Sequence, residues 1–297
     1  MNGLLDVADE VREALVAAGA VVALETTLVA HGFPPGRGVE VGLESERRVR
    51  RAGAVPATIG VLGGRVRVGL DPAELERFTT EARKVGPRDV AVCAVQGAVG
   101  ATTVGGTLAV ACAAGIRFMG TGGLGGVHRG WQELPDVSSD TGQLARTRAV
   151  VVSSGVKSLL DVTATAELLE TLGVPVLGFR TDDVPLFYTA RGGPPVSARA
   201  ESAAEAAEVA RRHWELCSGG LLLVNPPADS LDDVEPVVES ALAEARRQGM
   251  TGQAVTPFVL SFLHERSGGR TLEANARLVS DNAALAAEVA VAFAQLD

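Results

Sequence analysis

The sequence predicts an α/β protein: a three-layer α/β/α sandwich with a largely parallel or mixed central sheet. Its 297 residues are 46% hydrophobic, which is enough to bury a large core. Short apolar runs alternate along the chain with alanine-rich helical patterns, and this alternation is typical of a sheet that helices cover on both faces. The sequence contains no internal repeat and no long linker, so residues 1–297 are expected to form a single domain.

Six short apolar runs have the length and boundaries of buried strands, since each is bounded by glycine, proline or polar residues. They span residues 21–24, 90–95, 116–119, 149–152, 174–179 and 221–224. Residues 57–69 contain two extended runs around Gly63 and Gly64, a pattern that predicts a β-hairpin.

Helix signals lie between these runs. Asp71 and Pro72, followed by Glu74, predict a helix start: aspartate accepts a hydrogen bond from a free amide, proline suits the first turn, and an acidic residue favours the helix dipole. Further helices are expected at residues 197–215, 232–248 and 271–295. Another is expected after the strand at 149–152, with Lys157 in its first turn.

Charge and composition exclude several classes of protein. The net charge of −9 argues against a nucleic-acid surface, because binding many phosphates needs clustered cations. No apolar run reaches the roughly 20 residues that cross a bilayer, and the N-terminal segment is acidic where a signal peptide is basic. We therefore expect no membrane partner and a cytoplasmic protein. Cys93, Cys112 and Cys217 are widely spaced, which predicts reduced packing residues instead of a zinc site.

The segment GTGGLGG places Gly120, Gly122 and Gly125 in the G-x-G-x-x-G spacing of a dinucleotide-binding turn. In such a turn a helix begins within the glycines, so that its first amides meet the pyrophosphate. Here the chain continues as GVHRGWQELPDVSSDTG without a helical apolar period, which argues against a Rossmann site. The segment predicts instead a polar loop at the carboxyl end of a strand, where open α/β sheets bind their ligands.

Lysine is rare in this chain. The 27 basic residues are 25 arginines and only two lysines, Lys84 and Lys157. In the first turn of a helix, the dipole and nearby apolar residues would both favour an uncharged amine at Lys157. An uncharged amine can attack a carbonyl-like carbon and form a Schiff base, whereas arginine stays protonated. Lys157 is thus a candidate nucleophile, with an exposed lysine at a helix start as the alternative. Lys84 is expected to end an amphipathic helix, where a structural role is also open.

Candidate acids and ligands follow the predicted strands. Glu25 ends an apolar strand, where burial would raise the pKa of its carboxyl and let it hold a proton; a capping or ion-pair role is the alternative. Asp136 and Asp140 either bind a hard divalent ion such as Mg²⁺ or Mn²⁺ or cap local amides. His31 and His128 lie in the candidate active loops, whereas two further histidines in helical patterns, His213 and His264, are expected to be structural.

Eight ordered segments carry a resemblance to a known family. They are VVALETTLVAHGFP, ATIGVLGGRVRVGL, KVGPRDV, GATTVGGTLAVACAAGIRFMGTGGLGGVHRG, DVSSD, SSGVKSLLDVTATAELLETLGVPVLGF, DDVPLFYTARGG and LLLVNPP. Together, from about residue 20 to about residue 290, they resemble the pseudouridine-5′-phosphate glycosidases, also called the indigoidine synthase A-like family.

The resemblance implies reversible cleavage of the C–C glycosidic bond of pseudouridine 5′-phosphate to uracil and ribose 5-phosphate. Lys157 would attack C1′ while Glu25 protonates the ring oxygen; the C–C bond of the opened sugar then breaks, and the imine is hydrolysed. Asp136 would be the protein ligand of one largely hydrated Mn²⁺ per subunit, with Mg²⁺ as an alternative. The resemblance also implies an α/β/α sandwich and a homotrimer. Its expected substrate contacts are Lys84, Thr103, Val104, His128, Ser138, Ser139 and Asp140.

The chain departs from the family pattern at a few positions. Ser139 stands where relatives often have alanine, so its backbone is the expected contact. The segment SSGVKS replaces a Cys-Ala-Gly-Ala-Lys-Ser type of sequence, and Gly105 and Gly106 stand where alanines are usual. Asn275 and Asn282 are further candidates to face the base or the ribose. Two other functions compete: a class I aldolase-like lyase that acts on a sugar phosphate, and a non-catalytic sugar-phosphate sensor.

Overall fold

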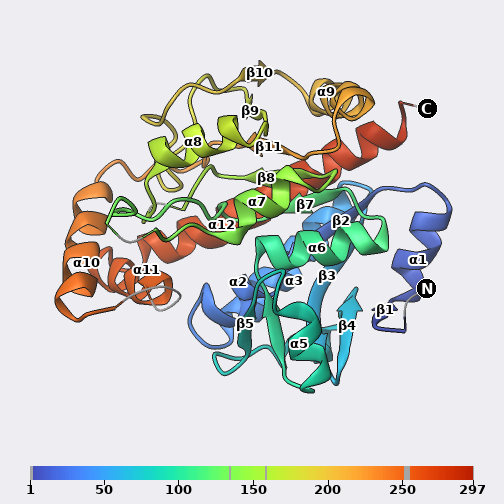
Figure 1. Ribbon diagram of the computed structural model, residues 1–297, viewed down its shortest axis with the longest axis horizontal. Helices are drawn as coiled ribbons and strands as arrows, with labels where there is room; N and C mark the ends of the chain where they lie inside the picture. Colours follow the sequence, from blue (N-terminus) through green and yellow to red (C-terminus); the bar gives the residue numbers. More distant parts are fainter. Residues whose placement is uncertain (1–2, 134, 158, 251–254, 297) are drawn as a thin grey trace.

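The computed structural model describes residues 3–133, 135–157, 159–250 and 255–296. These residues form one sheet with helices on both sides, so the predicted α/β/α architecture is confirmed (Figure 1). The strands are β1 (Leu5–Val7), β2 (Val21–Glu25), β3 (Val55–Leu62), β4 (Arg65–Val68), β5 (Arg83–Val85), β6 (Gly100–Thr102), β7 (Phe118–Gly120), β8 (Val150–Ser153), β9 (Val176–Phe179), β10 (Ala198–Ala200) and β11 (Leu221–Val224).

The sheet is mixed but mostly parallel. Its order is β1-β4-β3-β2-β7-β8-β11-β9-β10, with β6 paired to the end of β3 and β5 paired to β6. The ladders between β2, β7, β8, β11 and β9 are parallel. β3 and β4 form the predicted antiparallel hairpin, in whose turn Gly63 and Gly64 have φ angles of 59° and 76°. Glycine adopts this left-handed conformation without steric cost, which explains the pair at the turn.

Alternate residues of β2 face two different helix layers. Val21 and Ala23 belong to one hydrophobic core, and Val22 and Leu24 belong to the other. The first core is covered by α1 (Asp9–Val16), α5 (Val90–Val95), α6 (Val104–Ala114), α7 (Ser139–Ala145) and α8 (Val162–Thr171). The second is covered by α3 (Arg37–Arg51), α9 (Ala203–Leu216) and α12 (Arg270–Ala294). In Figure 1, α12 crosses behind α7.

Four more helices complete the fold. They are α2 (Thr27–His31), α4 (Pro72–Leu75), α10 (Glu235–Arg247) and α11 (Val255–Arg266). The predicted start of α4 is confirmed, because Asp71 accepts from the amide of Glu74 at 2.8 Å while Glu74 accepts from the amide of Asp71 at 3.1 Å. α10 and α11 pack on the loop that follows β8, in a third core that includes Leu160 and Phe187.

The strand predicted at residues 90–95 is wrong, because this segment forms α5. β5 and β6 run parallel, with Lys84 opposite Ala101, and a parallel pair needs a crossover connection, which α5 supplies. The apolar run is not buried throughout, since Val92 and Val95 are exposed on the outer face of the helix. A run of six apolar residues has too few turns for periodicity to distinguish a helix from a strand.

Other boundaries differ in smaller ways. The helix predicted at 197–215 begins at Ala203, because residues 198–200 pair with β9 as β10. All three cysteines are free thiols, as expected, but only Cys93 is buried; Cys112 and Cys217 are exposed and are not packing residues. Within the described ranges, no helix has both the length and the apolar character needed to span a bilayer.

Candidate active site

A cavity of about 470 Å³ lies among the segments that follow β5, β6, β7 and β8. Most of the predicted site residues line it, although they come from distant parts of the sequence: Lys84, Thr103, His128, Asp136, Ser138, Ser139, Asp140 and Lys157. Glu25 and Val104 are buried and do not line this cavity. No dinucleotide-type turn is present, since no helix begins within residues 120–125.

Both lysines reach the cavity from segments that the sequence analysis assigned incorrectly. Lys84 does not end a helix but lies in β5. Lys157 precedes its helix, because α8 begins at Val162, where Asp161 caps it by accepting from the amide of Ala164 at 2.9 Å. The backbone amide of Lys157 instead donates to the carbonyl of Leu124 in the glycine-rich loop, at 3.1 Å. The helix-dipole argument for Lys157 therefore does not apply.

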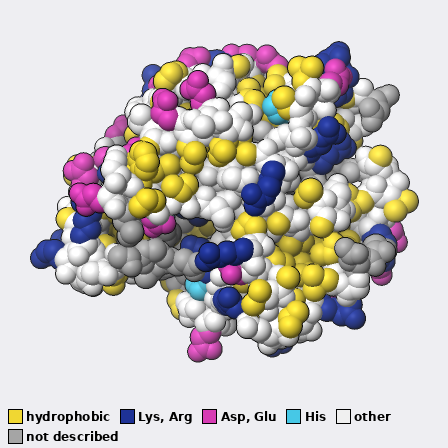
Figure 2. All heavy atoms as spheres, viewed as in Figure 1, with side chains coloured by type: hydrophobic (Ala, Val, Ile, Leu, Met, Phe, Trp, Pro, Cys, Tyr) yellow, Lys and Arg dark blue, Asp and Glu magenta, His cyan; other side chains and the backbone are white. Residues whose placement is uncertain are grey.

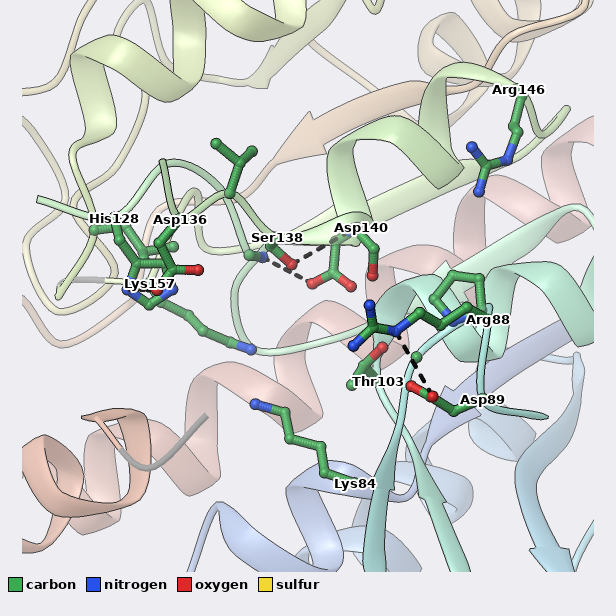
Figure 3. A pocket seen from close by; sticks show the side chains of 16 residues that line it. Lys84, Arg88, Asp89, Thr103, His128, Asp136, Ser138, Asp140, Arg146 and Lys157 are labelled. Carbon is green, nitrogen blue, oxygen red and sulfur yellow. Dashed lines mark hydrogen bonds and ion pairs between the residues drawn. The ribbon is translucent and has the colours of Figure 1, made fainter. Parts of the chain in front are cut away.

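The amino groups of the two lysines point into the same space (Figure 3). Burial, and after it the charge of Lys157, lowers the pKa of Lys84. Burial disfavours an ammonium group and a nearby cation disfavours it further, whereas the carboxylates of Asp140, Glu25 and Asp136 favour it. Burial, instead of a helix dipole, is thus the main reason why the amine of Lys84 loses its proton more readily in this cavity than in water.

Glu25 ends β2 and is 4% exposed. Burial raises the pKa of its carboxyl, while Lys157 and a hydrogen bond from Thr121 act in the opposite direction. The hydroxyl of Thr121 donates to Oε1 of Glu25 at 2.5 Å. The charges of Lys157 and Lys84 both act on Glu25 and lower the pKa of its carboxyl. The geometry combines a carboxyl group that can hold a proton with an amine that can lose one.

Asp140 joins two walls of the cavity. It is 3% exposed, and its two carboxylate oxygens accept from backbone amides: Oδ1 from Gly105 at 2.7 Å and Oδ2 from Gly125 at 3.1 Å. The first amide belongs to the start of α6 and the second to the glycine-rich loop. Gly125 must be glycine here, because a Cβ at this position would lie 2.5 Å from the Asp140 carboxylate. Asp140 thus shapes the site through backbone groups.

The starts of α6 and α7 both face the cavity. Thr103 caps α6 by accepting from the amide of Gly106 at 3.2 Å, and Ser138 caps α7 by accepting from the amide of Asp140 at 3.2 Å. Val104 is the first residue of α6; its side chain is fully buried, so only its backbone can meet a ligand. Amides in the first turn of a helix lack partners within the helix and are suited to bind an anion.

His128 and Asp136 lie together on the opposite side of the cavity (Figure 3). The amide of His128 donates to the carbonyl of Asp136 at 3.0 Å, and the two side chains are 3.9 Å apart. Burial lowers the pKa of His128, Asp136 raises it, and both lysines lower it further. Among the described residues no three histidine, cysteine or carboxylate side chains cluster tightly enough to enclose a metal ion. The donor set fits only an ion that keeps most of its water, as Mn²⁺ and Mg²⁺ can.

Several residues of the site were missed or left open by the sequence analysis. Arg88 lines the cavity, and its guanidinium forms an ion pair with Asp89 at 3.7 Å (Figure 3). Thr121 gives no sequence signal beyond its place after β7. Asn282 uses both ends of its side-chain amide within the protein, whereas Oδ1 of the buried Asn275 has no hydrogen-bond partner in the described structure. His31 lies outside the cavity lining, and its Nε2 donates to the carbonyl of Ala82 at 2.9 Å.

An α/β/α sandwich with two lysines, a buried carboxyl and helix N-termini around one cavity has the features of an enzyme for a small phosphorylated molecule. The chain belongs to the family described as indigoidine synthase A-like proteins, whose model matches residues 10–292. The predicted resemblance is therefore confirmed.

Close relatives match over nearly the whole chain. The chain is 50% identical to a pseudouridine-5′-phosphate glycosidase of Streptomyces griseus, over 96% of this chain and 91% of the relative. It is 43% identical to the enzyme of the same name from Caldanaerobacter subterraneus, over 100% and 99% of the two chains. Among solved structures, the prealnumycin C-glycosynthase in complex with ribulose 5-phosphate superimposes with a TM-score of 0.91 at 39% identity, covering 100% of this chain and 99% of that one. An indigoidine synthase A-like protein from Thermotoga maritima gives 0.87 at 37% identity, over 97% and 96%.

Proposed function

We propose that this protein reversibly cleaves the C–C glycosidic bond of pseudouridine 5′-phosphate, giving uracil and ribose 5-phosphate. The observation that carries the proposal is that both lysines of the chain point into one cavity, within electrostatic reach of a buried carboxyl. The relatives named pseudouridine-5′-phosphate glycosidase match the full chain, which supports the same substrate here.

The first step opens the sugar ring. The uncharged amine of Lys157 forms a bond to C1′ while the bond between C1′ and the ring oxygen breaks. Glu25 gives its proton to that oxygen, which leaves as the hydroxyl of the opened chain. Burial suits Glu25 to this role, because a carboxyl with a raised pKa still holds a proton near neutral pH.

The second step releases the base. The nitrogen of Lys157 carries a positive charge after the attack and first releases one proton. Its lone pair then forms a C=N bond to C1′ as the bond to C5 of uracil breaks with its electron pair, and one proton is added at C5, so that no net proton is consumed. Water then hydrolyses the imine to the aldehyde of ribose 5-phosphate and regenerates the amine. We propose that Asn275 hydrogen-bonds to the base. Its Oδ1 has no partner in the described structure and lies next to Gly122, 3.6 Å from the position that a Cβ on this glycine would take.

The phosphate group is proposed to bind at the other end of the cavity. The amides of Val104 and Ser139, the first residues of α6 and α7, supply hydrogen-bond donors there together with the hydroxyls of Thr103 and Ser138. Lys84 and Arg88 supply positive charge. Asp136, on the opposite side of the cavity, would hold one hydrated Mn²⁺ or Mg²⁺, whose charge would favour an anionic substrate in the cavity. His128 would donate to the substrate from the same side.

We further propose that the protein acts as a homotrimer in the cytoplasm. Apolar side chains gather on the face that carries α5 and α6 (Figure 2), where Val92 and Val95 are 45% and 87% exposed. Val137, at the rim of the cavity, is also exposed. An apolar surface of this kind is usually covered by another chain, which supports assembly beside the site.

Two other functions use the same groups. A class I aldolase-like lyase would form a Schiff base with an open-chain sugar phosphate. The structural match to a C-glycosynthase favours, as a second candidate, C–C bond formation with an acceptor other than uracil. All three predict a covalent adduct on a lysine and differ in the second substrate.

Incubation with pseudouridine 5′-phosphate and Mn²⁺, followed by quantification of uracil and ribose 5-phosphate, tests the proposal. We expect equal amounts of the two products. In the reverse direction, uracil and ribose 5-phosphate should give pseudouridine 5′-phosphate. Cleavage of ribose 5-phosphate or another sugar phosphate without any base would favour the aldolase-like function and contradict the proposal.

A further inference from the structure

A buried asparagine on α12 connects the two loops that lead to the reacting groups. Asn282 is 0% exposed. Its Nδ2 lies 2.8 Å from the carbonyl of Thr121, 3.3 Å from that of Gly122 and 3.1 Å from the hydroxyl of Ser154. Its Oδ1 accepts from the side-chain amide of Asn225 at 3.0 Å. The orientation of the Asn282 amide is therefore fixed from both ends.

The two loops held by Asn282 are also bonded to each other. The amide of Thr121 donates to the carbonyl of Val152 at 3.0 Å, and the amide of Ser154 donates to that of Gly122 at 2.8 Å. The loop after β7 continues to the Leu124 carbonyl that holds the amide of Lys157. Helix α12 also packs tightly here, since a Cβ on Gly120 would lie 2.7 Å from Cα of Ala283. This close packing leaves the Asn282 side chain at the base of both loops.

The same loop reaches the proposed acid. The carbonyl of Thr121 accepts a hydrogen bond from Asn282, and the hydroxyl of Thr121 donates one to Oε1 of Glu25. A hydroxyl that donates to Oε1 leaves the other carboxyl oxygen to carry the transferable proton. Any shift of the Thr121 backbone therefore changes the orientation of the Glu25 carboxyl and of the proton that it carries. The small cavity beside Glu25 is lined mainly by apolar side chains, including Leu24, Leu28 and Val279. Its two hydroxyl side chains are already engaged, because Ser45 donates to the carbonyl of Val41 and Thr58 donates to Glu46.

We propose that Asn282 is a positioning residue of the reaction, which acts through Thr121 to orient the carboxyl of Glu25. The inference rests on the proposed function, because it assigns to Glu25 the role of proton donor. Asn282 itself does not contact substrate, since its amide is already engaged within the protein.

The direction of the effect on pH dependence follows from the groups around Glu25. Its charged neighbours are Lys157, Lys84 and Asp140, and the Thr121 hydrogen bond lowers its pKa. Loss of that bond therefore raises the pKa of Glu25. A proton donor loses activity as the pH rises through its pKa, so the falling, alkaline limb of kcat/KM moves to higher pH.

The test is a double-mutant cycle with Asn282→Ala, Thr121→Val and the double variant. In each single variant we expect kcat to fall by about 10- to 100-fold, KM for pseudouridine 5′-phosphate to change little, and the alkaline limb to move upward. The double variant should be no slower than Thr121→Val alone, within about threefold, because both changes remove the same interaction. Ser154→Ala is the matched control: it removes one partner of Asn282 without touching Thr121, and should keep the wild-type pH profile.

The infrared carboxyl band of Glu25, identified by its loss in Glu25→Gln, reports the same pKa shift without turnover. This readout separates the inference from the proposed function, which fails if the wild type releases no uracil. Multiplicative losses in the double variant, or an unmoved carboxyl band in Asn282→Ala, would overturn the inference. If Asn282→Ala does not fold, two milder variants replace it. Asn282→Ser shortens the side chain that donates to Thr121, and Asn225→Ala removes the group that holds Oδ1 of Asn282. A carboxyl band of Glu25 that does not move in either variant would overturn the inference equally.

Discussion

Replacing Asp140 by asparagine tests whether this carboxylate holds the cavity walls together. Asparagine fits the same space and keeps one acceptor oxygen, but it puts an NH₂ group against one of the two backbone amides of Gly105 and Gly125. The variant loses one charge-assisted hydrogen bond and leaves a buried amide without an acceptor. A hydrogen bond to a charged group contributes about 1.5–3 kcal/mol, so we expect a destabilisation of about 2–3 kcal/mol. The slope of a urea titration is about 3 kcal/mol/M for a large domain, so the midpoint should fall by roughly 0.7–1 M.

Urea titration followed by circular dichroism gives the midpoint, and steady-state kinetics give the functional effect. KM should rise, because the start of α6 is no longer held against the glycine-rich loop. Thr141→Val is the control, since Thr141 is also buried on α7 and its hydroxyl makes a neutral hydrogen bond to the carbonyl of Ser138, at 3.1 Å. We expect this control to lose about 1 kcal/mol and to keep its KM. A midpoint for Asp140→Asn within error of the wild type would refute the structural role of the carboxylate.

Three further predictions concern the chemistry. Borohydride added during turnover should fix the sugar phosphate to the peptide that carries Lys157, whereas an adduct on the Lys84 peptide would reassign the nucleophile. Lys157→Arg should be as inactive as Lys157→Ala, since a guanidinium cannot form the imine. Glu25→Gln keeps the shape of the side chain but not its proton, so kcat should fall by about 10²–10⁴ with KM largely kept, and near-normal turnover would exclude Glu25 as the acid. A chelator should abolish activity and leave the far-UV circular dichroism unchanged, because an ion held by Asp136 alone is not needed for folding; a loss of helical signal would contradict this.

The parts of the fold that the sequence predicted well are those with strong local signals. The strands at the centre of the sheet, such as β2 and β11, are short runs buried on both faces, and their composition reflects that burial directly. The hairpin of β3 and β4 follows from Gly63 and Gly64, which tolerate a turn that other residues resist. In each case the cause of the structure lies within the segment itself.

The wrong assignments have causes outside the segment. α5 is a helix because β5 and β6 pair in parallel, and no local feature of residues 90–95 reveals that pairing. Lys157 was assigned to a helix because the apolar pattern of α8 extends backwards, whereas the capping Asp161 marks the true start. That aspartate was a usable signal, since aspartate is a preferred capping residue.

The site shows the same division. Residue types suited to the chemistry, such as Lys157 and Glu25, could be selected from the sequence because few residues can be an amine nucleophile or a buried acid. The partners that orient them could not, because Thr121 and Asn282 are 161 residues apart and meet only through the packing of α12 on the sheet. Their roles depend on one hydrogen bond each, which leaves no pattern along the chain.

Lys84 shares the cavity with Lys157, and the charge of Lys84 is expected to matter for binding. Burial, and after it the charge of Lys157, lowers the pKa of Lys84, so the Lys84 amine loses its proton more readily in the empty cavity than in water. A bound phosphate group carries two negative charges and favours a charged cation at the amine nearest to it. If Lys84 is that amine, it takes the charged form when substrate binds. An arginine at position 84 keeps the positive charge, so Lys84→Arg should retain part of the activity that Lys84→Met loses. Equal losses in the two variants would show that the reaction does not depend on the charge at this position.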